Sequence, residues 1–468
     1  MKKKYLLFLM VSLMRIGTVC AQFTDLHNFN DTSGSYPSSP LVISGKTMFG
    51  ATPGGGLYGT GIIYSLDTNG NNFKVLYTFD TTFYYSANSG PYGGLTLLGS
   101  KLYGATNRLG LYGDGNIFSI DTDGSNYKDL FDLNDTDGQY PSGYLVYSYG
   151  KLYGMTPQGG ANGYGVIFSI DTSGSHYRDL LDFNGINGSQ GNGSLTIINN
   201  KIYGPTWQGG IYNRGTLFSL DTNGAAYKKL HDFNDTDGAA PAGGLAAFNN
   251  KLYGIAEWKG ANAGYIFSID TSGSNYKNIY RLNDSNVDIN TSLLYNNGVL
   301  YGMSDLGGNY QDGSLFALDT DGSNYKEFFS FNHTDGGNLE DGKLTLYGNT
   351  LYGVAYQGGP FDYFGVVFKY SESEVTTSVK ELTATKGLIH VYPNPSNGNY
   401  EFQITNYEAG SANIEVYNVL GQQVYSKQAV ISNSQFVIEL NQPSGVYLYR
   451  VIANSGEVIG EGKLVIQK

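Results

Sequence analysis

The sequence contains almost no cysteine, and its single thiol, Cys20, lies within the first 22 residues. The rest of the chain therefore has no means of forming a disulfide or a cysteine metal site. After this N-terminal segment, no apolar run approaches the roughly 18 residues of a membrane-spanning helix. The chain also lacks GxSxG, HExxH, CxxC and Walker motifs, so nothing in it indicates nucleophilic, zinc or phosphate chemistry.

Basic residues are scarce as well. The 28 lysines and arginines are outnumbered by 40 aspartates and glutamates, which gives a formal net charge of -12 and a pI near 4.8. A chain of this charge repels a phosphate backbone, so we expect no nucleic-acid partner. The 66 glycines and 41 tyrosines instead suit many short strands with tight turns and an aromatic core.

The chain begins with MKKKYLLFLMVSLMRIGTVCAQ, in which three lysines precede an apolar run that ends in small residues. This pattern predicts a secretory signal peptide over residues 1–21, cleaved between Ala21 and Gln22, although Arg15 within the apolar run is atypical. Attachment of a lipid to Cys20 is the alternative, but Val19 is a poor match to the small residue that precedes such a cysteine.

Seven copies of one pattern follow at intervals of about 50 residues. Each contains an aromatic-glycine element such as LYG, whose aromatic residues are Phe49, Tyr103, Tyr153, Tyr203, Tyr253, Tyr301 and Tyr352. Each unit has four short apolar segments flanked by glycine, asparagine or aspartate, for example YLVYSYG, KLYGMT, GVIFSID and RDLLDFN, which are typical of strands. An Asp-Thr-x-Gly sequence between the third and fourth segments predicts a hairpin turn.

Units of four strands repeated at this period are typical of a β-propeller. Only six of the third strands are followed by a fourth, and the seventh copy of that strand, TDLHNFN at 24–30, stands at the start of the chain. We therefore predict an all-β fold with a seven-bladed β-propeller over residues 22–371. Its ring is closed by pairing of the N-terminal strand with GVVFKYS at 365–371, which leaves no open sheet edge.

The repeat sequences resemble the GloVer repeats of secreted bacterial proteins over about residues 41–370. The matching stretches are MFGATPGGGLYGTGIIYSL, LYGMTPQGGANGYGVIFSI and LYGVAYQGGPFDYFGVVFKY. The resemblance implies an extracellular repeat domain, but it brings no activity and no catalytic residue with it.

A polar linker over residues 372–387 precedes residues 388–468, where alternating strands predict a small β-sandwich. Four motifs occur there in order: Tyr-Pro-Asn-Pro, Val-Tyr-Asn-Val-Leu-Gly, Gly-Val-Tyr and Gly-Lys-Leu-Val. Their defining residues are Tyr392, Pro393, Asn394, Pro395, Gly421, Gly445, Tyr447, Gly462 and Lys463.

Together these four motifs resemble the type A C-terminal sorting domain of the type IX secretion system of Bacteroidota. The resemblance implies export by the signal peptide, then passage of the outer membrane through contact of the tail with the secretion machinery. It also implies removal of the tail, after which the cargo is released or attached to the cell surface. We therefore expect a secreted or outer-membrane-surface protein with no transmembrane span in the mature chain. An ordinary adhesion-like sandwich is the alternative.

Acidic turns and histidines are the first candidate sites. The sequence NDTDG at 134–138 and 234–238 offers oxygen ligands for calcium, but its spacing fits no calcium loop and Asx turns explain it. His27 and His231 share the register of aromatic residues and leucine in the other fourth strands, so we interpret both as packing residues. We predict no metal site and no cofactor.

A more informative position lies three residues after the glycine of each LYG element, where the chain enters a loop. Equivalent loops of a propeller share one face, so these residues should line a common rim: Pro53, Asn107, Pro157, Trp207, Glu257, Asp305 and Tyr356. Aromatic rings beside carboxylates and amides suit a sugar, because the rings stack on it and the polar groups bind its hydroxyls. The predicted ligand-binding residues are Trp207, Gln208, Glu257, Trp258, Asp305, Tyr356 and Gln357. Free variation of loop tips is the alternative.

The sequence thus predicts a secreted, non-catalytic propeller that binds a glycan or a protein, with no catalytic residues. Two alternatives stay open. In the first, the protein is a polysaccharide lyase or glycoside hydrolase that uses Glu257 and Asp305 as a carboxylate pair, which requires a separation of about 5 to 9.5 Å. In the second, it is a structural surface protein without a discrete ligand.

Overall fold

A computed structural model describes residues 22–80, 89–257, 264–282, 291–339, 342–361, 363–371, 389–404, 410–418, 423–431, 435–453 and 458–467. The chain divides into two compact units, Met1–Ser373 and Glu374–Lys468. The predicted signal peptide and linker lie outside the described residues. Within the described ranges, β-strands account for every element except one short 3-10 turn, η1 (Asp31–Ser33), and no helix is long and apolar enough to cross a membrane.

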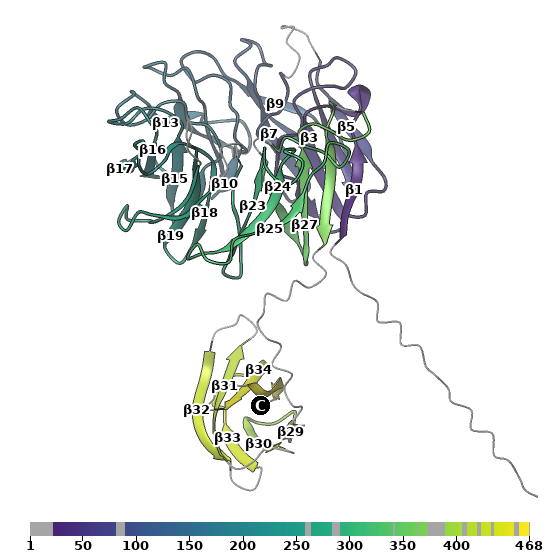
Figure 1. The fold of residues 1–468 in the computed structure, drawn as a ribbon, viewed down its shortest axis with the longest axis vertical. Helices are drawn as coiled ribbons and strands as arrows, with labels where there is room; N and C mark the ends of the chain where they lie inside the picture. The colour runs from purple at the N-terminus through teal and green to yellow at the C-terminus, as the bar shows by residue number, and fades with distance from the viewer. Residues whose placement is uncertain are drawn as a thin grey trace, which may run out of the picture. The chain divides into compact units, whose positions relative to one another are not determined.

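The described part of the first unit contains seven four-stranded antiparallel sheets (Figure 1). Six of these sheets are each built from four strands that are consecutive in the chain. The first three comprise β2 (Val42–Ser44), β3 (Thr47–Thr52), β4 (Ile62–Asp67) and β5 (Lys74–Thr78); β6 (Thr96–Leu98), β7 (Lys101–Thr106), β8 (Asn116–Asp121) and β9 (Lys128–Asp132); and β10 (Val146–Ser148), β11 (Lys151–Met155), β12 (Val166–Asp171) and β13 (Arg178–Asp182). The next three comprise β14 (Thr196–Ile198), β15 (Lys201–Thr206), β16 (Thr216–Asp221) and β17 (Lys228–Asp232); β18 (Ala239–Phe248), β19 (Lys251–Glu257), β20 (Tyr265–Asp270) and β21 (Lys277–Arg281); and β22 (Leu294–Asn296), β23 (Val299–Ser304), β24 (Ser314–Asp319) and β25 (Lys326–Ser330).

The seventh sheet joins the two ends of this unit. Its strands are β26 (Thr345–Tyr347), β27 (Thr350–Ala355), β28 (Val366–Ser371) and the N-terminal β1 (Gln22–Asn28), in the order β1-β28-β27-β26. In Figure 1 the purple β1 lies beside the green strands from the end of the unit. The strands β1 and β28 are antiparallel, and Phe23 pairs with Tyr370. The predicted pairing of the N-terminal segment with this strand is therefore confirmed, and β1 begins at Gln22 rather than at Thr24.

A cross-strand pair explains the glycine of each LYG element. Gly204 in β15 pairs with Phe218 in β16, and a Cβ atom at this glycine would lie only 2.8 Å from Cζ of that ring. A Cβ atom added at Gly154 would lie 2.3 Å from Cζ of Phe168. The glycine lets the aromatic ring of the third strand lie flat across the second, where it is fully buried.

The Asp-Thr-x-Gly hairpin turns are also confirmed. Gly174 has a φ of +87° and donates its N–H to the carbonyl oxygen of Asp171 at 2.9 Å. The carboxylate of Asp171 accepts from Nζ of Lys151 at 2.7 Å. Equivalent ion pairs tie the second and third strands of three further sheets: Lys101–Asp121, Lys201–Asp221 and Lys251–Asp270.

Hydrophobic clusters join each sheet to the next one along the chain. A further cluster joins the seventh sheet to the first, where Leu26 and Phe29 contact Met48 and Tyr64. Hydrogen bonds cross the same boundaries: Oγ1 of Thr196 donates to the carbonyl of Leu245 at 2.8 Å. In the same way, Oγ1 of Thr345, in the seventh sheet, donates to the carbonyl of Leu41, the residue before β2 of the first sheet, at 2.7 Å.

The second unit contains two sheets that share one core of aromatic and aliphatic residues. Its strands are β29 (Ile389–Tyr392), β30 (Asn399–Ile404), β31 (Gly410–Asn418), β32 (Gln423–Ile431), β33 (Gln435–Glu439), β34 (Gly445–Ala453) and β35 (Val458–Ile466). Two of the predicted motifs meet here, because Nδ2 of Asn394 donates to the carbonyl of Lys463 at 2.7 Å and Oδ1 of Asn394 accepts from Val465 N at 2.8 Å. Tyr447 pairs with Leu464 in the neighbouring strand, whereas Gly421 lies outside the described residues.

Candidate functional site

In three of the sheets, the residue that follows the second strand donates its N–H to the backbone of a neighbouring loop: Asn107 to Gly90, Trp207 to Gln190 and Tyr356 to Asn338. Trp207 follows β15, and its N–H donates to the carbonyl of Gln190 at 3.1 Å. Gln208 and Ser189 exchange a pair of backbone hydrogen bonds, of 2.9 and 3.1 Å. In these three sheets the position predicted to line a rim therefore has a fixed backbone.

A shallow pocket surrounds the side chains of Trp207 and Gln208. Its volume is about 60 Å³, and it is completed by Asn213, Arg214, Asp235, Ala239 and Ala240. Nε of Arg214 lies 2.5 Å from Oδ1 of Asp235, in an ion pair whose two side chains are about half exposed. The pocket thus presents an indole, an amide and a charged pair, a combination that can bind a polar ring.

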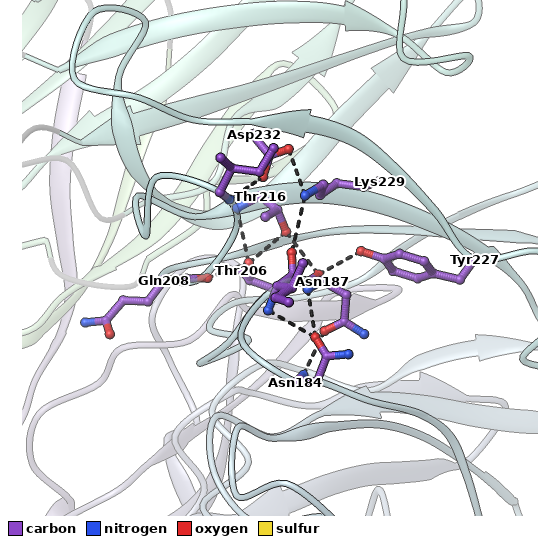
Figure 2. Close-up of polar contacts among 10 residues, drawn as sticks. Asn184, Asn187, Thr206, Gln208, Thr216, Tyr227, Lys229 and Asp232 are labelled. Atoms are coloured by element: carbon purple, nitrogen blue, oxygen red, sulfur yellow. Dashed lines mark hydrogen bonds and ion pairs between the residues drawn. The ribbon is translucent and has the colours of Figure 1, made fainter.

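A network of hydrogen bonds supports the loops around this pocket (Figure 2). Oγ1 of Thr206 donates to the carbonyl of Gln208 at 2.9 Å and lies 2.9 Å from the hydroxyl of Thr216. The hydroxyl of Tyr227 donates to the carbonyl of Asn187 at 2.7 Å. Asp232 forms a 2.8 Å ion pair with Lys229, which also donates to a backbone carbonyl of the loop around Asn187. The loop around Asn187 and the loop after β15 are thereby both tied to β17 or the residue before it.

The other predicted ligand-binding residues are dispersed. Glu257 ends β19 and is partly buried, whereas Asp305 is only 6% exposed. The ring of Tyr356 lies 5.1 Å from that of Tyr36, and Gln357 pairs through its backbone with Gly337. Trp258 lies outside the described residues. Of the seven candidates, the described pocket brings together only Trp207 and Gln208.

The two histidines are packed as expected. His27 stacks on Phe73 with ring centroids 3.6 Å apart, and His231 stacks on Tyr276 at 3.9 Å. Tyr77 makes the same contact with Tyr127 in another sheet. Burial lowers the pKa of His27 to about 4, so this ring is neutral at physiological pH.

The Asx turns are as predicted, since Oδ1 of Asn134 accepts from the N–H of Thr136 at 2.9 Å and from its hydroxyl at 2.6 Å. Among the described residues, no group of three or more histidine, cysteine or acidic side chains is arranged to hold a metal ion.

Sequence reasoning did not identify a larger pocket of about 290 Å³ between the first two sheets, lined by Tyr77, Arg108, Asn116, Tyr127 and Asp129 among others. Between the second and third sheets, the loop after β9 covers the equivalent place. The carbonyl of Asp135 in that loop accepts from Gly160 N, between β11 and β12, at 2.8 Å. The corresponding segment here, residues 81–88, lies outside the described residues, so we assign no site to this pocket.

A narrow cavity of about 20 Å³ is lined by residues from the start of every repeat, including Ser38, Gly93, Ser194, Gly243 and Ser292. Two large side chains meet across it: Nζ of Lys343, in the last repeat, donates to the hydroxyl of Tyr144, in the third, at 3.3 Å. Residues far apart in the sequence thus converge at one place.

These features define a class of protein, namely an all-β repeat protein built from four-stranded sheets and followed by a separate two-sheet unit. Two matches to the Gloeobacter/Verrucomicrobia repeat model cover residues 81–264 and 249–414, which together are more than half of the chain. The chain belongs to this repeat family, as its sequence indicated. Residues 390–467 match the secretion system C-terminal sorting domain, so the chain is a repeat protein exported by the type IX secretion system.

Several solved structures are similar to this chain at low sequence identity. PorZ, a surface component of the type IX secretion system of Porphyromonas gingivalis, is 15% identical, with 93% of this chain and 60% of PorZ covered and a TM-score of 0.45. A puromycin-hydrolyzing peptidase of Mycobacterium tuberculosis is 15% identical, with 81% and 60% covered and a TM-score of 0.49. An oligogalacturonate lyase in complex with manganese is 11% identical, with 75% and 93% covered and a TM-score of 0.46. The chain spans 60% of the length of PorZ. No curated protein matches the chain.

Proposed function

We propose that residues 22–371, after removal of the signal peptide at 1–21, form a closed seven-bladed β-propeller. A linker at 372–387 then leads to the sorting domain at 388–468. Three observations support the ring: β1 completes the last sheet, that sheet packs against the first, and every repeat contributes to one central cavity.

This propeller is a non-catalytic binding protein that works outside the cell or at the outer-membrane surface, and its ligand is a glycan. The observation that carries the proposal is the shared pocket of Trp207 and Gln208 beside the Arg214–Asp235 ion pair. An indole face stacks on a sugar ring, while the amide and the charged pair supply donors and acceptors for hydroxyls. Binding of a protein at the same loops is the other form of this proposal.

A lyase or hydrolase has weaker support. The carboxylate pair that it would use consists of Glu257 and Asp305, and the burial of Asp305 leaves little room for a sugar beside it. A purely structural role without a ligand does not account for the pocket around Trp207.

The test is a glycan-array screen of the full chain beside the Trp207→Ala variant. We expect at least one glycan to bind. The substitution should weaken that binding about tenfold, because stacking of a sugar on an aromatic ring is worth roughly 1 kcal/mol or more. Tyr149→Ala is the matched control, since this exposed tyrosine lies in the β10–β11 hairpin at the opposite end of its sheet. Binding that survives Trp207→Ala would contradict the proposed site, and no glycan binding at all would leave a protein ligand.

A further inference from the structure

The loops between the second and third strands expose large apolar side chains at their tips. Four of these loops contain a tight turn in which an N–H donates back over three residues to a glycine carbonyl: Gly59 to Gly56, Gly113 to Gly110, Gly163 to Gly160 and Asn213 to Gly210, at 3.1 to 3.3 Å. The two central residues of three of these turns are Leu57-Tyr58, Leu111-Tyr112 and Ile211-Tyr212. All six side chains are exposed, with Leu57 at 78% and Ile211 at 71%.

The same feature recurs elsewhere in the described loops. Tyr310 occupies the equivalent place between β23 and β24, and Phe361 between β27 and β28; both are more than half exposed. The third sheet has Ala161-Asn162 at the tip instead, followed by the exposed Tyr164. Six of the seven repeats therefore present at least one large apolar side chain on an equivalent, described loop.

These tips are held rigidly by the sheets below them. The N–H of Leu111 donates to the carboxylate of Asp132 at 2.8 Å, and that of Ile211 donates to the carboxylate of Asp232 at 2.9 Å. In the sixth sheet the N–H of Asn309 donates to the hydroxyl of Ser330 at 2.7 Å. In these sheets the last residue of the fourth strand thus fixes the turn, and the apolar side chains project from a firm base.

Folding does not explain these residues. The central positions of tight turns ordinarily hold glycine, proline, asparagine, aspartate or serine, which satisfy the turn and remain in water. Leucine or isoleucine followed by tyrosine adds nothing to the turn and leaves apolar surface exposed. Repetition of such a pattern on equivalent loops is the sign of a contact surface.

We propose that these loop tips form a ring of apolar contacts that seats this face of the protein on the headgroup region of a lipid layer. The inference rests on the ring of sheets proposed above, because only in a closed ring do equivalent loops lie on one face. It goes beyond the glycan proposal, since it assigns a different set of residues and a different ligand.

The chemistry of the tips favours lipid over the other partners. Aliphatic side chains at tips next to tyrosines match the composition of membrane-interface segments, in which aliphatic groups enter the acyl boundary and tyrosine remains at the headgroups. A sugar stacks on tyrosine but gains little from leucine or isoleucine. A protein partner usually buries one compact central cluster, whereas these side chains are distributed over six sheets, which suits a flat and laterally continuous surface.

Charge specifies the kind of lipid. None of the turn residues named above is charged, and the chain carries a net charge of -12. An anionic lipid surface would repel the protein, so the expected partner has neutral or zwitterionic headgroups.

The test is co-sedimentation of the full chain with phosphatidylcholine vesicles. We expect the wild type to bind, and the triple variant Leu57→Ser, Leu111→Ser, Ile211→Ser to bind at least tenfold more weakly, because each change removes an inserted aliphatic group. Addition of phosphatidylglycerol to the vesicles should weaken binding of the wild type. A matched control is the triple variant Tyr147→Ser, Tyr149→Ser, Tyr347→Ser, which removes exposed tyrosines from hairpins at the opposite ends of the sheets and should bind as the wild type does.

Three results would overturn the proposal: no vesicle binding by the wild type, unchanged binding by the loop-tip variant, or an equal loss in the control variant. Glycan binding that depends on the loop tips in the absence of vesicle binding would also overturn it, in favour of sugar contacts. Trp207→Ala separates the two proposals, because it should weaken glycan binding about tenfold and leave vesicle binding intact. All six substitutions lie at exposed positions, so thermal unfolding should be unchanged and loss of folding would not be confused with loss of binding.

Discussion

At the scale of single residues, Tyr64 departs from its repeat. It occupies the position that holds phenylalanine in the other third strands, such as Phe118 and Phe168, and it is fully buried. Its hydroxyl has no hydrogen-bond partner within the described part of the chain, and burial raises its pKa far above the usual value. A buried hydroxyl without a partner costs free energy that a phenyl ring does not.

We therefore expect Tyr64→Phe to raise the free energy of unfolding by about 1 kcal/mol. Urea unfolding at neutral pH measures the change, and Tyr352→Phe is a suitable comparison because the hydroxyl of Tyr352 donates to the carbonyl of Thr68 at 3.3 Å. The comparison variant should lose stability. A loss of stability in Tyr64→Phe would mean that its hydroxyl is solvated.

Asp179 in β13 is a second residue with an uncompensated polar atom. Its Oδ1 is buried without a hydrogen-bond partner in the described structure. Burial raises its pKa to about 6, the nearby Asp182 and Asp137 add to this rise, and a hydrogen bond with Tyr177 opposes it. The folded-state pKa thus exceeds the unfolded value near 3.8, so this carboxylate destabilises the fold above pH 6 and the penalty disappears as the pH falls toward 4.

Asp179→Asn should accordingly stabilise the protein at pH 7.5 by about 1 kcal/mol, after allowance for partial solvent screening, and should have little effect at pH 4. Asp123→Asn is the control with the opposite sign. The hydroxyl and N–H of Ser125 bond to Asp123 and lower its pKa, so its loss should cost stability at pH 7.5. Equal effects of Asp179→Asn at both pH values would show that folding does not raise the pKa of this carboxyl.

At the scale of elements, local patterns predicted most of the strands. The Asp-Thr-x-Gly turns and the short apolar segments specify hairpins within a repeat, and the early copy of the fourth strand predicted the partner of β28. The contact between Gly204 and Phe218 could not be predicted from the sequence, because it depends on the register between two strands and not on either strand alone.

The candidate site was only partly predictable for a related reason. Position in the repeat places Trp207 and Asp305 equally at the end of a second strand, but it does not fix the direction of the side chain. The first lines an open pocket and the second is buried. The exposed pairs such as Leu57-Tyr58 resemble core residues in composition, so the sequence gives no reason to place them at the tip of a turn.

At the scale of the whole molecule, the proposed ring makes the boundary between the last and first sheets equivalent to any other. Thr345→Val removes the hydrogen bond to the buried Leu41, and Thr196→Val removes the matching bond to Leu245 within the chain. Each should lower the free energy of unfolding by about 1 kcal/mol. Chemical denaturation measures both variants under the same conditions. A cost for Thr196→Val with none for Thr345→Val would indicate that the ring is open between its ends.

The central claim is that the propeller binds a glycan without altering it. The most direct measurement is to incubate the full chain with a glycan that it binds on the array and to follow the mass of that glycan by mass spectrometry. We predict binding that depends on Trp207 and a glycan whose mass stays unchanged over the incubation. Shortened or unsaturated products that disappear in Glu257→Gln would contradict the account and identify an enzyme.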